Sequence, residues 1–297
     1  NSSLTIYKDL EEMLKSEKID ILSICTPNGL HFEHSMVAAK YGTDVITEKP
    51  LTSSWSDGLK MVNLFNEKKL NLYVVKQYRY NPTLVKLKDA LNEGRFGKIH
   101  MININVFWTR PQHFFDQEDW RGTKELDGGA LMNQASHYVD LLHWLGGPVK
   151  KIQSISSTFL DIDVEDTSVL NIEWISGAIG SMSVTLLTYP ANLEGSVTVI
   201  GENGLVKISG VACNIIEEWK FLDESDDDIN IDKTNYEPKD VYGNGHRLYY
   251  DRLYDVHLNN LPSKIDGNEG LKTLEIITAA YISADKNVTI NLPLEKK

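Results

Sequence analysis

Three polar side chains within one stretch of sequence have types that suit proton transfer to and from an alcohol. Asn133, His137 and Asp140 are spaced i, i+4 and i+7, so a helix over residues 130–145 would carry all three on one face. A neutral imidazole takes up a proton near neutral pH, and an amide both donates and accepts hydrogen bonds. Asp140 is predicted to hold the imidazole ring and to set its tautomer. A purely structural histidine on a packed helix is the alternative.

A lysine follows a short apolar segment earlier in the chain. Residues 44–47 are rich in β-forming side chains, and Pro50 of the Glu48-Lys49-Pro50 sequence cannot continue a central strand. The carboxyl ends of strands face the ligand crevice in an open α/β sheet, so Lys49 is predicted to supply a hydrogen bond or a positive charge there. Burial or a cationic neighbour would lower its pKa. A solvated Glu48–Lys49 pair at a turn is the alternative.

Lys49, Asn133 and His137 together suit the oxidation of a carbinol. A zinc site is the rival interpretation, but no His-x-x-x-His sequence or pair of nearby cysteines completes a tetrahedral shell. We therefore predict an enzyme without a metal.

Alternating apolar segments predict the elements that position Lys49. Helices and strands alternate through the first third of the chain, which is typical of a parallel, doubly wound α/β sheet of the Rossmann type. The predicted strands span residues 19–25, 44–47 and 70–75, and the predicted helices span residues 7–14, 30–40, 54–67 and 83–93.

A phosphate-binding fingerprint is missing from this pattern. A dinucleotide-binding fold opens with a strand, a Gly-x-Gly-x-x-Gly turn and an acidic residue about 20 positions later, and the 297 residues contain no such sequence. A three-stranded parallel sheet with a bare edge would be a poor stand-alone domain. We expect that an N-terminal portion of the fold lies outside this sequence. The alternative is a complete sheet that binds no dinucleotide.

The hydrophobic period changes to two from about residue 100. Residues 100–108 predict a half-buried antiparallel strand, and the following strands predict a meander in an open, mainly antiparallel sheet. The predicted domains are therefore residues 1–96, the Rossmann part, and residues 97–297, an α+β domain. The later predicted elements are strands at 152–159, 167–174, 178–187, 194–200, 205–209 and 289–292, helices at 246–259 and 270–284, and a solvated acidic loop at 224–232.

The composition excludes several classes of partner. Thirty Lys and Arg against 42 Asp and Glu give a formal net charge of −12, so nucleic acid and anionic membranes are not expected partners. No apolar run approaches eighteen residues, and the chain has two cysteines, Cys25 and Cys213. We predict a cytoplasmic protein with two free, buried thiols. One disulfide between them is the alternative.

Five motifs in this order resemble the Gfo/Idh/MocA family of NAD(P)-dependent sugar oxidoreductases. The resemblance implies a Rossmann domain, an α/β domain whose open sheet serves as a dimer or tetramer interface, and NAD as cofactor, with NADP not excluded. The motifs are Thr26-Pro27-Asn28 with His31, Glu48-Lys49-Pro50, Arg79-Tyr80-Asn81-Pro82, Trp120-Arg121-Gly122, and Gly128-Gly129 through His137.

The resemblance also implies the site. Lys49 would lie between cofactor and substrate, with a cis bond to Pro50. Arg110 or Arg121 would meet a substrate carboxylate or diphosphate, or form a structural ion pair, and Trp108 and Trp120 would wall the sugar or belong to the core. The predicted cofactor-binding residues are Thr26, Pro27, Asn28, His31, Glu48, Lys49, Gln77, Trp120 and Arg121. The predicted substrate-binding residues are Lys49, Tyr80, Asn81, Trp108, Arg110, Asn133, Gln134 and His137.

One departure from the family pattern bears on the mechanism. Many members carry an aspartate where this chain has Asn133, which leaves His137 as the expected base and Lys49 as the group that stabilises the alkoxide. Swapped roles remain an alternative. Asn133 and residues 107–112, 132–138 and 188–195 resemble the branch that oxidises UDP-N-acetylglucosaminuronate at C3 for surface-polysaccharide sugars. A sibling dehydrogenase for inositol, glucose or another sugar and a non-catalytic member are the competing interpretations.

Overall fold

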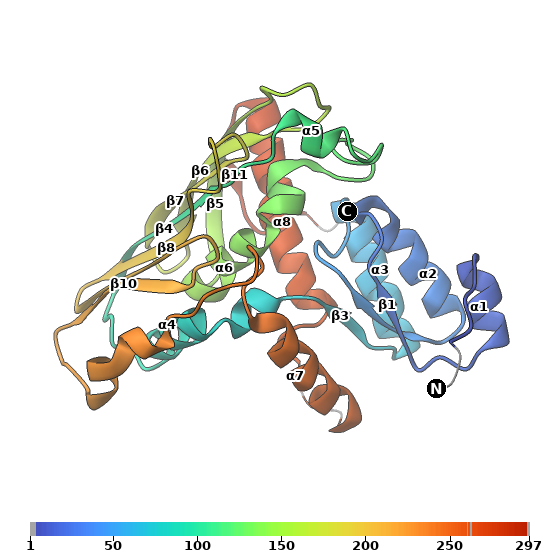
Figure 1. Cartoon of the computed structure of the whole chain (residues 1–297), viewed down its shortest axis with the longest axis horizontal. Coiled ribbons are helices and arrows are strands. Elements are labelled where there is room, and N and C mark those ends of the chain that lie inside the picture. Colours follow the sequence, from blue (N-terminus) through green and yellow to red (C-terminus); the bar gives the residue numbers. More distant parts are fainter. Residues whose placement is uncertain (1–3, 260, 262, 296–297) are drawn as a thin grey trace.

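The computed structural model describes residues 4–259, 261 and 263–295, and places the predicted parallel sheet beside a larger, mainly antiparallel one (Figure 1). The smaller sheet has three parallel strands in the order β1-β2-β3. Its elements are α1 (Leu10–Ser16), β1 (Ile21–Ile24), a 3-10 turn η1 (Asn28–Leu30), α2 (His31–Lys40), β2 (Asp44–Thr47), α3 (Trp55–Lys68) and β3 (Leu72–Val74).

The larger sheet has eight strands in the order β10-β9-β8-β4-β7-β6-β5-β11. Its elements are a 3-10 turn η2 (Gln77–Tyr80), α4 (Pro82–Asn92), β4 (Ile99–Phe107), α5 (Gln112–Phe115), a π-helical turn η3 (Ala130–Gln134), α6 (Ser136–Gly146), β5 (Val149–Ser157), β6 (Thr167–Trp174), β7 (Ile179–Thr185), β8 (Glu194–Gly201), β9 (Gly204–Ser209), β10 (Ile215–Phe221), a 3-10 segment η4 (Asp226–Thr234), α7 (Gly245–Asn259), α8 (Gly267–Lys286) and β11 (Ile290–Asn291).

The pairing of β4 differs from the prediction. β4 is antiparallel to β8 but parallel to β7, and it lies between these two strands, so the predicted continuous meander is interrupted there. β10 was not predicted at all. The alternation of side chains along a strand fixes which face is buried, whereas the choice of neighbouring strand depends on the rest of the sheet.

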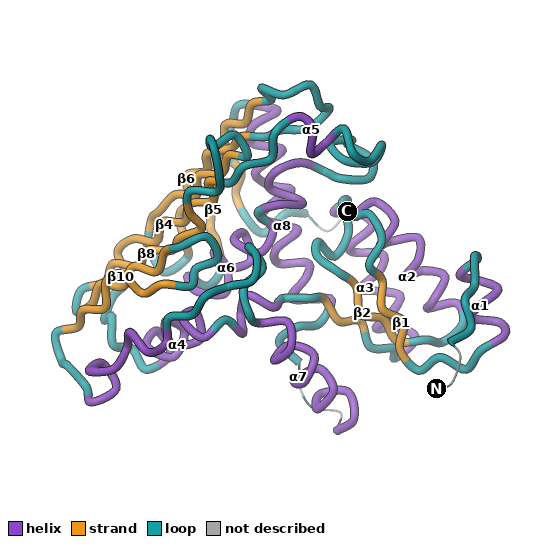
Figure 2. The backbone as a smooth tube through the Cα atoms, viewed as in Figure 1, coloured by secondary structure: helices purple, strands orange, loops and turns teal. Residues whose placement is uncertain are grey.

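One face of the large sheet is covered by helices and the other is open. Ile102, Ile104 and Val106 of β4 are completely buried, and α4, α6 and α8 pack against the strands on that side (Figure 2). Ile155 of β5 and Ile179 of β7 are 69% and 53% exposed. The sheet therefore has the one-sided burial that an open antiparallel sheet shows.

Helix α8 joins the two sheets. It packs against α3 and β3 on one side and against α6 and β5 on the other. The chain just before α8 also extends the small sheet, because the amide of Val74 donates to the carbonyl oxygen of Ile265 at 2.8 Å. The ends of β2 and β3 thereby lie beside α6, where His137 and Asp140 lie.

Three local predictions are corrected. The single helix predicted over residues 130–145 is a π-helical turn and α6, separated at Ala135. Both cysteines are free, as predicted, but only Cys213 is buried and Cys25 is exposed. The acidic segment predicted as a solvated loop is partly 3-10 helical, and Asp228 forms an ion pair with Arg95 at 2.6 Å.

Candidate active site

Lys49 reaches from the carboxyl end of β2 to the turn that precedes α6. Its Nζ donates to the carbonyl oxygen of Asn133 at 2.8 Å and to Asn133 Oδ1 at 3.2 Å, across 84 positions of sequence. The peptide bond between Lys49 and Pro50 is cis, as the family resemblance implied. Burial lowers the pKa of the Lys49 ammonium, and the negative charges of Glu48 and Asp127 oppose that effect.

His137 lies on α6 and lines the same cavity as Lys49. It is 3% exposed, and its ring stacks on Tyr78 with the ring centres 4.9 Å apart. The Gln77 side-chain amide lies 2.9 Å from Nε2 of the imidazole. Burial, reinforced by the positive charge of Lys49, holds the pKa of His137 well below its usual value. The imidazole is therefore neutral at pH 7, the state in which it accepts a proton.

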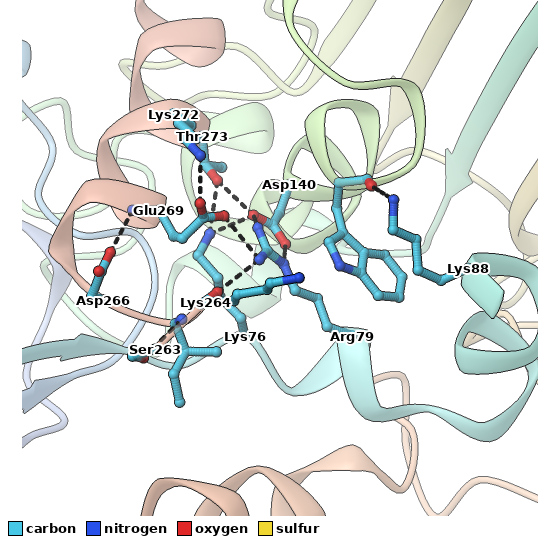
Figure 3. A network of polar contacts seen from close by, with 12 residues as sticks. Lys76, Arg79, Lys88, Asp140, Ser263, Lys264, Asp266, Glu269, Lys272 and Thr273 are labelled. Carbon is cyan, nitrogen blue, oxygen red and sulfur yellow. Dashed lines mark hydrogen bonds and ion pairs between the residues drawn. The ribbon is translucent and has the colours of Figure 1, made fainter. Parts of the chain in front are cut away.

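Asp140 does not hold the imidazole, contrary to the prediction. Its carboxylate accepts from Arg79 Nε at 2.7 Å and from Thr273 Oγ1 at 2.8 Å, and it forms a short ion pair with Lys76 (Figure 3). Figure 3 shows Glu269 of α8 completing the network, through Arg79 at 3.0 Å. Helical spacing placed Asp140 near His137, but two buried cations compete for the carboxylate.

Asn133 is presented by the π-helical turn rather than by α6. Two glycines with positive φ, Gly128 and Gly129, lead into the turn, and a Cβ at Gly129 would lie 1.9 Å from an oxygen of Glu165. The Glu165 carboxylate accepts from the amide of Leu131 at 2.8 Å and from the Tyr281 hydroxyl at 2.9 Å. The close approach of Glu165 to the backbone therefore requires glycine at position 129.

Glu165 gives this turn a pH dependence. Burial raises the pKa of its carboxyl from 4.5 to about 7. The stability that this group contributes is present below pH 4.5 and is lost as pH rises through about 7, because the folded state holds the proton longer. We expect Glu165→Gln to gain about 1–3 kcal/mol over the wild type between pH 5 and pH 8. Urea denaturation at several pH values measures this difference. The exposed control Glu67→Gln should show no such trend, and a constant difference for Glu165→Gln would contradict the assignment.

Most of the residues predicted for the cofactor follow the ends of β1 and β2, whereas Gln77 follows β3 and Trp120 and Arg121 lie in the loop after α5. His31 bridges two turns, with Nδ1 2.8 Å from the carbonyl oxygen of Pro50 and Nε2 3.0 Å from that of Thr26. Asn28 donates from Nδ2 to the carbonyl oxygen of Asp127 at 2.6 Å. Both side chains therefore fix the strand ends relative to each other and to the second domain. Glu48, which is half-buried, accepts from the Lys49 amide at 3.2 Å.

Two residues predicted to contact the sugar are buried. Trp108 is 1% exposed and packs edge-on against Tyr138, with the ring centres 5.7 Å apart. Asn81 is completely buried, and its Oδ1 accepts from the amide of Asn244 at 3.1 Å. These contacts favour the core alternative for Trp108 and a role for Asn81 in holding the loop before α7.

The remaining predicted contacts are half-buried. Arg110 Nε donates to Gln134 Oε1 at 3.0 Å, and Arg121 donates to the carbonyl oxygen of Phe114 at 2.9 Å. Within the described part of the chain neither arginine forms an ion pair, so the structural ion-pair alternative finds no support there. Trp120 lies beside Arg121, whose guanidinium is 5.7 Å from the indole centre. Tyr80 packs edge-on against Tyr249 at 6.0 Å.

Sequence reasoning missed two residues of the site. Asp127 accepts a short hydrogen bond from Asn133 Nδ2 and one of 2.7 Å from the Gly122 amide. Its position directly before Gly128-Gly129 was the available signal. The Tyr242 ring lies 6.3 Å from that of His137, and it comes from a loop whose sequence carries no periodic pattern.

Two family models match the two parts of the chain. Residues 1–76 match the oxidoreductase family NAD-binding Rossmann fold, and residues 88–292 match the oxidoreductase family C-terminal alpha/beta domain. The WlbA dehydrogenase of Bordetella pertussis, solved in complex with NADH and UDP-GlcNAcA, is 46% identical with a TM-score of 0.91, over 97% of this chain and 83% of that one. The WlbA dehydrogenase of Chromobacterium violaceum, solved with the same two molecules, is 48% identical with a TM-score of 0.92, over 97% and 82%.

More distant curated relatives share only part of their length with the chain. Levoglucosan dehydrogenase of Pseudarthrobacter phenanthrenivorans is 24% identical over 67% of this chain and 57% of that protein. An NADP(+)-dependent scyllo-inositol 2-dehydrogenase of Bacillus subtilis is 29% identical over 48% of this chain and 39% of that protein. Both domains of the chain match family models, and these matches confirm the predicted family and fold class. The chain belongs to the Gfo/Idh/MocA oxidoreductase family.

Proposed function

We propose that the protein oxidises a secondary alcohol of a nucleotide sugar with a nicotinamide cofactor, and that the substrate is UDP-N-acetylglucosaminuronate, oxidised at C3. The observation that carries the proposal is the meeting of Lys49 and His137 in one cavity between the end of β2 and α6. The likeness to two dehydrogenases solved with NADH and UDP-GlcNAcA, at 46% and 48% identity, supports the substrate class.

The polar groups at the ends of the parallel strands fit a nicotinamide cofactor. Turn 26–28 follows β1, Glu48 follows β2 and Gln77 follows β3. The carboxyl ends of the strands form the crevice where open α/β sheets bind ligands. Gln77 Oε1 is buried without a hydrogen-bond partner among the described residues, and it is an acceptor available to a bound amide. When bound, the nicotinamide ring accepts the hydride from the sugar carbon.

His137 accepts the hydroxyl proton in this proposal, and Lys49 stabilises the developing alkoxide. The Gln77 amide faces Nε2 of the neutral imidazole, so that nitrogen carries the lone pair. Activity should fall at acid pH as His137 becomes protonated, below its usual range because burial lowers its pKa. Activity should also fall at alkaline pH as Lys49 loses its proton. If Lys49 were the base instead, the Lys49→Arg variant would lose the acid limb.

Arg110 is the candidate for the anionic part of the substrate. Its guanidinium lies 5.3 Å from the indole centre of Trp108, and among the described residues its hydrogen-bond acceptors are neutral oxygens of Gln134, Thr109 and Asn192. A half-buried guanidinium without a carboxylate partner is suited to bind a carboxylate or a phosphate in a bidentate manner.

The test is a substrate panel with the full-length protein. UDP-N-acetylglucosaminuronate, UDP-N-acetylglucosamine, glucose, myo-inositol and levoglucosan are each incubated with NAD and with NADP, and the absorbance of the reduced cofactor is followed. We expect reduction with the uronate and with NAD. Reduction with another sugar would identify a sibling dehydrogenase, and no reduction with any sugar would refute the proposed activity.

Assembly and location complete the proposal. We propose a dimer or tetramer formed through the open face of the large sheet, since Ile155, Val169 and Ile179 are exposed there on adjacent strands. The free, exposed thiol of Cys25 suits a reducing compartment, which supports the cytoplasm. No helix in the described ranges is both long and apolar enough to cross a membrane.

A further inference from the structure

We propose that Asp127 is a positioning residue for Lys49: through the side-chain amide of Asn133 it holds the lysine ammonium in the site, and together with Glu48 it supplies negative charge that favours the protonated lysine. This inference rests on the proposed function, in which a charged Lys49 stabilises an alkoxide. Asp127 itself touches neither the cavity lined by Lys49 and His137 nor their nitrogen atoms.

The hydrogen bonds around Asp127 favour its ionised form. Oδ1 accepts from Asn133 Nδ2, and Oδ2 accepts from the Gly122 amide at 2.7 Å. Both partners are donors, and hydrogen bonds donated to a carboxyl group favour its charged form. Asp127 is 3% exposed, and this isolation from water strengthens its field at short range.

The contact with Asp127 fixes the orientation of the Asn133 side-chain amide. Its Nδ2 faces the carboxylate of Asp127, so its Oδ1 must face the opposite way, where it accepts from Lys49 Nζ at 3.2 Å. The Asn133 carbonyl oxygen accepts from the same Nζ at 2.8 Å. The ammonium is therefore held by two oxygens of one residue, and Asp127 fixes which end of the amide it meets.

Few negative charges near Lys49 oppose the effect of burial on its pKa. Burial lowers the pKa of Lys49. The carboxylates of Glu48 and Asp127 raise this pKa, whereas the positive charge of Arg110 lowers it further. Burial raises the pKa of Asp127, while the hydrogen bonds from Gly122 and Asn133 oppose that rise. The titratable groups that act on Lys49 or Asp127 from the surrounding elements are Glu48, Arg110, Arg121, His31, His137, Glu165 and Tyr281.

The side-chain amide of Asn133 separates the carboxylate of Asp127 from the ammonium of Lys49. A swap of the two residues, Asp127→Asn with Asn133→Asp, keeps every hydrogen bond paired. The new amide at position 127 would accept from Gly122 and donate to the new carboxylate, which would accept from Lys49. The single change Asp127→Asn instead turns a donor toward Asn133, whose amide must flip and present Nδ2 to Lys49.

The first measurement is a titration of Lys49 in the full-length protein without substrate. Carbon-13 at the lysine ε positions is followed by NMR against pH, and the Lys49→Met variant identifies the Lys49 signal. We expect Lys49 to titrate at lower pH in Asp127→Asn than in the wild type, and at higher pH in the swapped double variant. Asp119→Asn, which removes an exposed carboxylate from the same loop, should leave the titration unchanged.

The second measurement is turnover on the same variants. We expect kcat/KM to fall by about 10–100-fold in Asp127→Asn and to return to within about fivefold of the wild type in the double variant. An unchanged Lys49 titration in both variants would overturn the inference, with or without turnover. A shifted titration in a protein that oxidises none of the sugars would support the link between Asp127 and Lys49 and refute the proposed function. If Asp127→Asn fails to fold, the double variant still decides the direction of the shift.

Discussion

The Lys49→Met variant is expected to turn over about 10²–10³-fold more slowly than the wild type, because one preorganised charge at a developing alkoxide is worth several kcal/mol. Methionine keeps much of the length of the lysine side chain and removes the ammonium. The two hydrogen bonds to Asn133 are lost with it. Steady-state kinetics with the uronate and NAD measure the effect. The change should appear in kcat, since the charge acts mainly in the transition state.

Two controls separate this loss from damage to the fold. Binding of reduced cofactor, followed by its fluorescence, should change by less than about threefold, because a loss confined to the transition state leaves ground-state binding intact. Lys68→Met removes an exposed lysine from the end of α3 and should behave as the wild type. Near-normal turnover in Lys49→Met would mean that Lys49 is a structural link between the domains and not part of the reaction.

The second large effect concerns stability. The Asp140→Asn variant is expected to lower the free energy of unfolding by about 3–5 kcal/mol, since it removes one partner from a buried ion network. The carboxylate is 5% exposed and meets both Lys76 and Arg79, and Arg79 alone keeps a second carboxylate, Glu269. Urea denaturation at pH 7 measures the difference. The network joins the end of β3 to α6 and α8, so loosening of the domain contact should accompany the loss.

The pH dependence of this effect has a definite sign. Arg79 and Lys76 hold the pKa of the Asp140 carboxyl far below its usual range. The stability it contributes is therefore present above about pH 4 and is lost as pH falls below that value. The difference between Asp140→Asn and wild type should shrink accordingly in acid.

A partly exposed pair provides the control for this variant. Asp57→Asn breaks the contact between Asp57 and Lys60 on α3 and should cost less than about 1 kcal/mol. A cost as small for Asp140→Asn would contradict the network as drawn. It would indicate that Lys76, whose pKa burial lowers to about 8, gives up its proton when its partner is removed.

The short motifs were informative because their geometry is local. The apolar segment at residues 44–47 is β2, and the bond from Lys49 to Pro50 is cis. A strand that ends at a proline needs no distant partner to be recognised, and the crevice rule then places Lys49. The same reasoning found β1, β3 and most helices to within a few residues.

Local spacing was not sufficient to predict which side chains share one face of the helix. An ideal helix would place Asn133, His137 and Asp140 in one row, but Asn133 belongs to a π-helical turn that ends before α6 begins. The turn depends on Glu165 and Tyr281, whose contacts with residues 128–132 cross 34 to 153 positions of sequence. No periodicity within residues 130–145 records these contacts.

The sequence by itself determined the two kinds of sheet and the family, and it singled out Lys49 and His137 as the candidates for the chemistry, because motifs and periodicity follow from backbone geometry within a few residues. Only the tertiary structure decided the interaction partners: Asp140 forms ion pairs with Lys76 and Arg79, and Asp127 accepts a hydrogen bond from Asn133. Which partner a buried charge takes depends on the desolvation cost and the attraction of groups that come from α6, α8 and the ends of β2 and β3. These groups come together only once the chain has folded.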